Sequence, residues 1–264
     1  MPTRSIRLGL LAALAAVSAP SWAQDTRPSA EPESKPQAKS KAASKATRPR
    51  RDPPGTYMGR PIAPVMSYLG AEWLIRETRV DEEQPDRMLD ALKLKPGDVV
   101  ADVGAGVGYT SERIARRVGQ DGKVLATDVQ PQMLEMLAER MKAAGVKNVE
   151  PKLCTQDDTK LPEGSVDLAI LVDVYHEASR PDLLLQGIFK ALKPGGRLVL
   201  VEFRGEDPEV PIRPEHKMTL DQVKKEVAPQ GFAFVESQEF LPWQHLIIFR
   251  KPATVAGAEG KTEP

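Results

Sequence analysis

Cysteine is almost absent from this chain, which has Cys154 alone among 264 residues. One thiol cannot form an intrachain disulfide, and it cannot build a thiolate metal site. Charge of either sign is not in excess, because 37 lysines and arginines balance 37 aspartates and glutamates. Nucleic-acid binding usually shows as a basic surplus. The composition therefore gives no reason to expect a nucleic-acid partner.

The glycine-rich segment at residues 99–118 lacks the marks of two common phosphate-binding loops. A β-branched apolar run ends near Asp102, glycines follow at every second position, and a helical pattern begins near residue 111. This order lets the backbone approach a ligand closely. A dinucleotide loop places its third glycine where Tyr109 stands, and a P-loop needs a Lys-Ser/Thr pair that is missing here. The D-x-G-x-G-x-G spacing therefore disfavours both.

The N-terminus has the pattern of a secretory signal. Arg4 and Arg7 precede an apolar run at residues 8–17, and Ser21-Trp22-Ala23 follows as a small-x-small cleavage site. We expect cleavage after Ala23 and export to the periplasm. An uncleaved membrane anchor is the alternative, although the run is short for a comfortable span. A translation start near Met58 would instead give a cytoplasmic protein.

Composition then divides the rest of the chain. Residues 24–55 are mainly Pro, Ala, Ser, Lys and Arg, with almost no large apolar side chain. Such a segment cannot bury enough surface to offset its ordering entropy, so we expect a disordered linker. A polar tail at residues 253–264 is expected to be disordered too. One domain remains at residues 56–252, which is long enough for a proper core and is expected to hold no membrane span.

Strands and helices alternate along this domain. Apolar runs predict strands at five places, and helical patterns with Pro and Gly boundaries lie between them. This order predicts a parallel sheet with helices on both faces. Two final strands, at residues 232–240 and 243–250, are separated only by Leu241-Pro242, which requires a hairpin with one antiparallel strand. The five preceding strands are predicted at residues 99–103, 123–127, 149–153, 166–172 and 197–202.

An acidic residue stands at or just after the end of each of those five strands. In open α/β sheets, ligands bind beyond the carboxyl ends of the strands. Five acids in register therefore predict a shared ligand cleft. The five are Asp102, Asp128, Asp157, Asp173 and Glu202.

Several segments together give a specific resemblance. Residues 58–250 resemble the class I S-adenosylmethionine (SAM) methyltransferases, and within them the ubiquinone/menaquinone-type group. The resemblance implies a Rossmann-like α/β fold with a seven-stranded, mostly parallel sheet and a C-terminal antiparallel hairpin. The segments that carry it are residues 100–109 (VADVGAGVGY), 126–128 (ATD), 156–162 (QDDTKLP), 166–168 (VDL) and 192–196 (LKPGG).

The resemblance also implies a cofactor site for SAM. Asp102 would orient the glycine loop and reach the methionine amino group. Asp128 would accept hydrogen bonds from both ribose hydroxyls, and Asp157 from the adenine amino group. Gln156 departs from the glycine that this group often has there. The full expected set is Asp102, Gly104, Ala105, Gly106, Gly108, Asp128, Val129, Asp157, Asp158 and Asp173.

Catalysis is expected from the segment after the fourth strand. His176 has the pKa range of a general base, and Tyr175 could hydrogen-bond or wall the acceptor. A structural role for His176, as a helix cap or a backbone contact, is the alternative. His216 lies after the fifth strand, where acceptor-side insertions commonly sit. Asp173, Glu202 and His216 could hold a cation, but their spacing has no ligand signature, so we expect no metal.

These expectations converge on a methyltransferase that modifies a small molecule. The segment after the fourth strand lacks an Asn-Pro-Pro-Tyr-like motif, which disfavours nucleobase and protein-amide acceptors. The scaffold itself supports C-, O- and N-methylation, so the acceptor stays open. The signal sequence leaves a second hypothesis, since SAM is made in the cytoplasm: an exported binding module with the same fold and no turnover. The sequence indicates no oligomeric state.

Overall fold

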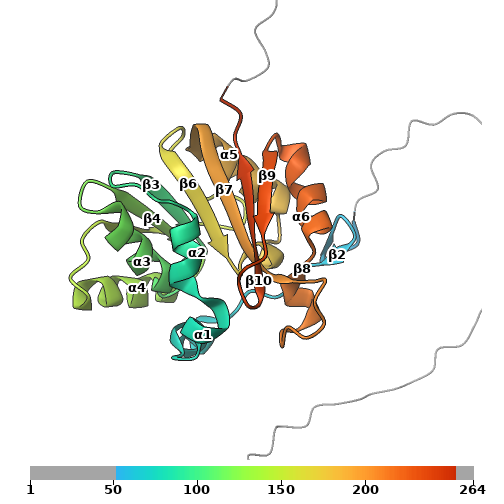
Figure 1. The fold of residues 1–264 in the computed structure, drawn as a ribbon, viewed down its shortest axis with the longest axis horizontal. Helices are drawn as coiled ribbons and strands as arrows, with labels where there is room; N and C mark the ends of the chain where they lie inside the picture. The colour runs from blue at the N-terminus through green and yellow to red at the C-terminus, as the bar shows by residue number, and fades with distance from the viewer. Residues whose placement is uncertain (1–51, 254–264) are drawn as a thin grey trace, which may run out of the picture. The chain divides into compact units, whose positions relative to one another are not determined.

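The computed structural model describes residues 52–253. The expected signal at residues 1–23, most of the expected linker and nearly all of the expected tail lie outside these residues. Figure 1 shows a central twisted sheet with helices on both faces. The strands of this sheet follow the order β5-β4-β3-β6-β7-β10-β9, and β8 pairs with β7 outside that path. Their bounds are β3 (Val99–Val103), β4 (Lys123–Asp128), β5 (Val149–Leu153), β6 (Val166–Val172), β7 (Leu192–Arg204), β8 (Lys217–Met218), β9 (Ala233–Gln238) and β10 (Gln244–Arg250).

The strand directions confirm the predicted class of fold. Strands β5, β4, β3, β6 and β7 are parallel, while β10 runs antiparallel to both β7 and β9. The sheet contains one strand more than expected, because Lys217 and Met218 pair with the end of β7. Strand β7 also starts at Leu192 rather than at residue 197, since Val166 pairs with Leu192 before a register shift.

Helices cover both faces of the sheet because successive strand residues point to opposite sides. Val100 of β3 belongs to a core cluster with α2 and α3, whereas Ala101 belongs to a cluster with α5 and α6. The sequence predicts helices at residues 86–92, 111–118, 131–144, 181–192 and 219–228, and all five are present with ends that differ by one or two residues. Their bounds are α2 (Pro85–Ala91), α3 (Tyr109–Val118), α4 (Pro131–Ala143), α5 (Pro181–Ala191) and α6 (Leu220–Val227).

The N-terminal part of the domain is a separate cap. The sequence predicts one or two short helices between residues 58 and 80. The structure has a 3-10 helix there, η1 (Tyr68–Ile75), and a short α-helix, α1 (Arg79–Glu83), that continues beyond this range. Two short strands, β1 (Thr56–Tyr57) and β2 (Arg60–Pro61), form a small hairpin that the sequence did not predict. Strands of two residues carry too little periodic pattern to be recognised.

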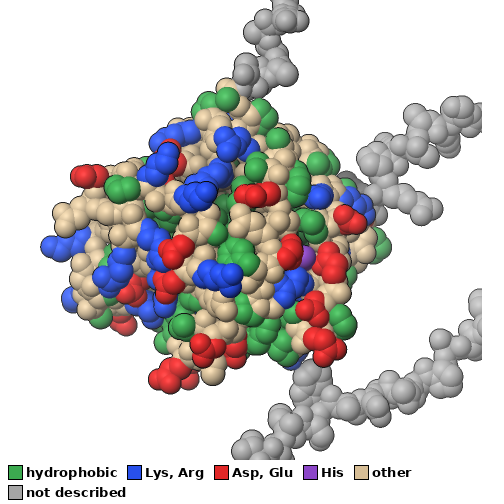
Figure 2. Space-filling model, viewed as in Figure 1, with side chains coloured by type: hydrophobic (Ala, Val, Ile, Leu, Met, Phe, Trp, Pro, Cys, Tyr) green, Lys and Arg blue, Asp and Glu red, His purple; other side chains and the backbone are tan. Residues whose placement is uncertain are grey.

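The surface mixes both signs of charge. Figure 2 shows lysine and arginine side chains interspersed with aspartates and glutamates over the face in view. Among residues 52–253, no helix has the length and apolar character needed to cross a membrane.

Candidate functional site

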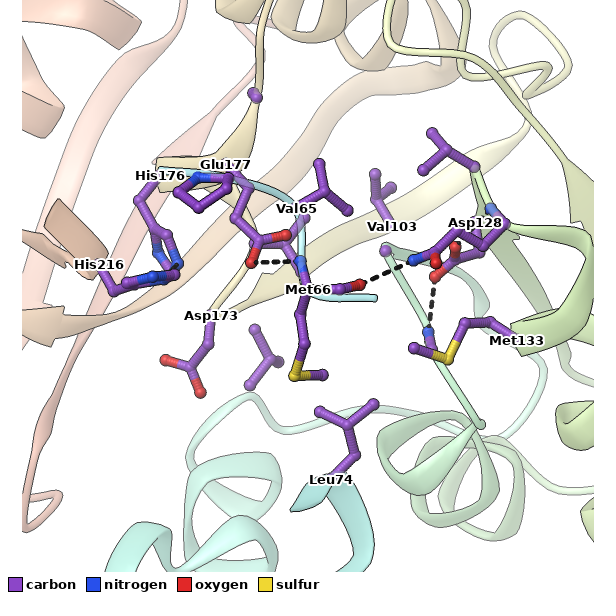
Figure 3. A pocket seen from close by; sticks show the side chains of 18 of the residues that line it. Val65, Met66, Leu74, Val103, Asp128, Met133, Asp173, His176, Glu177 and His216 are labelled. Carbon is purple, nitrogen blue, oxygen red and sulfur yellow. Dashed lines mark hydrogen bonds between the residues drawn. The ribbon is translucent and has the colours of Figure 1, made fainter. Parts of the chain in front are cut away.

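A cavity of about 560 Å³ opens at the carboxyl ends of the parallel strands. This volume is in the range of small-molecule sites. Its walls come from the loops after β3, β4, β5 and β6, from the segment after β7, and from the cap (Figure 3). The cavity is therefore where open α/β sheets bind ligands.

Three hydrogen bonds hold the cap over this cavity. The Gln130 side chain accepts from the Tyr68 N–H and donates to the Met66 carbonyl, each at 2.9 Å. The Met66 N–H donates to Glu177 Oε1 at 3.2 Å. Figure 3 draws the bonds of Met66 as dashed lines to opposite walls. The cap thus touches the β4 side and the β6 side of the cavity.

The glycine loop presents bare backbone to the cavity. Gly104 and Gly106 line it, and both have positive φ values, 74° and 52°. A Cβ on Gly104 would lie 2.6 Å from the Val174 side chain, so a larger residue there would require movement. Gly108 and Ala105, which we expected in the cofactor site, do not line the cavity. A Cβ on Gly108 would meet Leu137 of α4 at 2.7 Å, so this glycine allows helix packing instead.

Asp128 connects the glycine loop to the end of β4. Its Oδ2 accepts from the Gly106 N–H and its Oδ1 from the Gln130 N–H, both at 2.9 Å. The carboxyl group lines the cavity beside Val129, and burial raises its pKa. Two backbone donors therefore fix the orientation of this acid. The carboxyl group is thus placed and oriented to accept from a ligand, and its expected role toward the ribose hydroxyls stays a prediction.

Asp102 lies behind the loop rather than in the cavity. It is 2% exposed, and the Ser111 hydroxyl donates to its Oδ2 at 2.6 Å. Burial raises the pKa of this carboxyl to about 6, against the opposing effects of Ser111 and Arg79. The carboxyl group is absent from the cavity wall, where the expected contact with a methionine amino group would require it. Asp102 instead supports the first turn of α3.

Asp157 and Asp158, the expected adenine contacts, are both exposed and do not line the cavity. Asp158 pairs with Lys160 at 2.6 Å, and its N–H donates to Thr155. The neighbouring Gln156 lines the cavity and accepts from the Ser179 N–H at 3.1 Å. Gln156, which departs from the glycine of the family pattern, thus lines the cavity where Asp157 and Asp158 do not.

Asp173 lines the cavity in an unusual backbone conformation, with φ at 55°. Gln244 donates to its Oδ2 at 3.2 Å, while its Oδ1 is buried and has no hydrogen-bond partner among the described residues. Burial, with the nearby carboxylates of Glu83 and Glu202, raises its pKa well above the ordinary value. A ligand that donates a hydrogen bond or carries positive charge would satisfy this oxygen.

Tyr175 does not have the place that we expected. Its side chain is fully buried in the core and absent from the cavity wall. Its hydroxyl donates to Glu226 of α6 at 2.9 Å, and Arg60 forms an ion pair with the same carboxylate at 2.7 Å. The prediction that Tyr175 contacts the acceptor is wrong, because the turn after β6 directs this ring into the sheet–helix interface.

His176 does line the cavity, as part of a buried chain of polar groups. Its Nδ1 lies 2.6 Å from Glu202 Oε2, and its Nε2 lies 3.1 Å from His216 Nδ1. Glu202 is fully buried, and its other oxygen accepts from the Tyr175 N–H at 2.8 Å. Glu177 borders the same region, and desolvation raises its pKa to about 7. Figure 3 shows the two imidazoles meeting on one wall.

Comparison with known proteins agrees with this geometry. Residues 100–196 match the Methyltransferase domain family. This part of the chain is thus similar to that domain family. The ubiquinone/menaquinone biosynthesis C-methyltransferase UbiE of Hydrogenovibrio crunogenus is 30% identical over 111 residues, which are 42% of this chain and 44% of that protein. The chain thus matches less than half the length of that relative.

Solved structures extend the likeness over the whole fold. A SAM-dependent methyltransferase from Aquifex aeolicus superposes with a TM-score of 0.68 and 25% identity, over 71% of this chain and all of that one. Phosphoethanolamine N-methyltransferase 2 of Haemonchus contortus, solved with SAM, gives 0.57 and 17%, over 70% of this chain and 56% of that one. The fold is that of the SAM-dependent methyltransferases, and SAM is the cofactor of this class.

The cavity fits such a cofactor on three counts. The glycine loop leaves room for a ligand against its backbone, backbone donors orient the Asp128 carboxyl on the cavity wall, and Asp173 Oδ1 has no hydrogen-bond partner within residues 52–253. All three lie on the cavity wall and belong to loops that follow β3, β4 and β6.

Proposed function

We propose that this protein transfers the methyl group of SAM to a small-molecule acceptor. One observation carries the proposal. A single cavity joins the glycine loop and Asp128 at one end to His176 at the other. The first end is suited to the cofactor and the second to an acceptor that must lose a proton.

Each residue at the cofactor end has a specific task in this proposal. Asp128 would accept from the ribose hydroxyls, since its two backbone donors already fix its orientation. Gly104 and Gly106 would lie against the methionine and ribose. Val129 would line the adenine, and Asp173 Oδ1 would accept from the positively charged methionine end. We propose no direct contact for Asp102 or Tyr175.

The acceptor end would mainly position its substrate. SAM supplies an electrophilic methyl group, so proximity and orientation can provide several kcal/mol, about 7–11 at best. His176 would take the proton of the acceptor through Nε2, because Glu202 holds its Nδ1, and the acceptor would replace the contact of Nε2 with His216. Apolar side chains from the cap and from β7, including Met66, Leu74 and Phe203, favour a small, largely apolar acceptor.

Export is a further part of the proposal. The signal pattern at residues 1–23 supports a mature periplasmic protein that begins after Ala23. N-terminal sequencing of the native protein after cell fractionation tests this point. An intact Met1 in the cytosol would contradict it.

Calorimetry with SAM and S-adenosylhomocysteine tests cofactor binding. Asp128→Ala should weaken binding by about 1.5–3 kcal/mol, the usual value of a charged hydrogen bond. Asp157→Ala is the matched control, because this exposed acid lies in the loop that follows the neighbouring strand β5 and does not line the cavity. Absence of binding by the wild type would refute the proposal. Equal affinities of the two variants would refute the role of Asp128.

A turnover assay separates an enzyme from a binding module. His176→Ala should leave SAM affinity nearly unchanged and lower the rate of S-adenosylhomocysteine formation with acceptor present. Tight SAM binding without turnover on any small-molecule acceptor would favour the binding module.

A further inference from the structure

The chain has only three histidines, and two of them meet at the cavity. His176 follows β6, whereas His216 ends a 3-10 turn, η3 (Pro214–His216), forty positions later in the chain. Their rings stand edge to face, with centroids 5.0 Å apart. A Glu177 oxygen lies with the two imidazole nitrogens in a group whose members are all within 4.8 Å of one another.

We propose that His176 Nε2, His216 Nδ1 and the Glu177 carboxylate bind one divalent transition-metal ion of the zinc class. Two imidazoles and one carboxylate are a common ligand set for a catalytic site with an open position. Zinc–nitrogen bonds of about 2.0–2.1 Å place two tetrahedral ligands about 3.3 Å apart. The two nitrogens here are 3.1 Å apart. The carboxylate oxygen, which lies within 4.8 Å of the two nitrogens, must move closer by up to about 1.5 Å, which a side-chain rotation of glutamate allows.

A buried carboxylate behind the first histidine supports this assignment. Metal-binding histidines usually donate their other ring N–H to a carboxylate or a carbonyl, which fixes the tautomer and raises the basicity of the ligand. Glu202 stands 2.6 Å from His176 Nδ1 and is itself fully buried. The Tyr175 N–H holds its other oxygen. His176 Nε2 is thereby directed, without its own proton, toward His216.

A direct hydrogen bond between the two imidazoles is the alternative to a metal ion at this position. With Nδ1–H donated to Glu202, His176 Nε2 accepts from His216 Nδ1–H in the metal-free chain. A divalent ion would replace that proton, since metal binding releases protons from its ligands. The carboxylate of Glu177 beside the pair favours the ion, because a shared proton between two neutral rings needs no third ligand.

The consequence for chemistry rests on the proposed function. An acceptor hydroxyl on the open position would be more acidic, and its proton would pass to solvent. The resulting oxygen lone pair would attack the methyl carbon while the carbon–sulfur electron pair returns to sulfur. The products would be a methyl ether and S-adenosylhomocysteine. His176 would then be a ligand instead of the base.

Metal analysis of the full-length chain, purified without a histidine tag, tests the site. We expect a stoichiometric divalent metal as isolated, or stoichiometric uptake of Zn²⁺ after stripping with a chelator. Co²⁺ in place of Zn²⁺ should give the visible absorption of a low-coordinate site. His216→Gln and Glu177→Gln should lose this uptake, and Glu202→Gln should weaken it by about 10–100-fold.

His245→Gln is the matched control. His245 is also buried and contacts two carboxylates, Glu206 and Glu239, but it lies outside the cavity wall. This variant should keep the metal. Retention of metal by His216→Gln equal to wild type, or no uptake of Zn²⁺ by folded wild type, would overturn the proposal. SAM calorimetry on the same stripped sample reports the cofactor site independently, so the two failures are distinguishable.

Discussion

Asp102→Asn should change how the stability of this protein depends on pH. The folded carboxyl has a pKa of about 6, raised from 3.8 by burial. A raised pKa for an acid means that the folded state binds the proton more tightly than the unfolded state. Burial of this carboxyl therefore costs least folding stability below pH 3.8, where it is protonated in both states. The loss of stability grows as pH rises to about 6 and is constant above that pH. The full penalty is about 3 kcal/mol at 1.36 kcal/mol per pKa unit.

The asparagine variant keeps the shape and carries no charge to bury. Its amide oxygen can still accept from Ser111, which donates at 2.6 Å in the wild type. The free energy of unfolding of the variant, relative to wild type, should rise by about 2 kcal/mol between about pH 4.5 and about pH 7. Urea unfolding at several pH values measures this difference, and other titrating groups cancel in the comparison. A difference that is flat across that range would refute the burial argument.

Two further changes test the glycine loop and the buried ion pair between Arg60 and Glu226. Gly104→Ala should weaken SAM binding at least about tenfold, because its Cβ would lie 2.6 Å from Val174; Gly195→Ala, at φ 79° with nothing within 4 Å, is the control for backbone strain alone and should leave binding unchanged. Arg60→Ala should lower the free energy of unfolding by about 3–5 kcal/mol in urea, since it strands the fully buried Glu226. Adding Glu226→Gln should recover part of that loss, and no recovery would contradict the charge argument.

The order of the elements could be predicted from the sequence because the central strands of the sheet are apolar runs. Strands β3 and β6 have the predicted bounds and are largely buried, which makes such runs easy to recognise. Strand β5 also has the predicted bounds, although it lies at the edge of the sheet and its residues Pro151 and Leu153 are exposed. The cap was harder to predict. Its 3-10 helix and its two-residue strands depend on contacts with distant elements and leave little periodicity.

The site could be predicted as a region but not side chain by side chain. Asp128 and His176 lie on the cavity wall as expected, whereas Tyr175, next to His176 in the chain, points into the core. Which of two adjacent residues faces a cavity depends on the turn that follows the strand, and no motif encodes that turn here. Glu177 was missed, although its place directly after Tyr175-His176 was a signal that could have found it.

The cap contacts described above have a consequence for the order of events in a catalytic cycle. Met66 bonds to Gln130 on one wall and to Glu177 on the other. Because the cap is attached to both walls, it cannot move away from the cofactor end of the cavity without also loosening its contact at the acceptor end. Loading of the cofactor and departure of the methylated product would therefore share one opening motion, and its rate would set an upper limit on turnover.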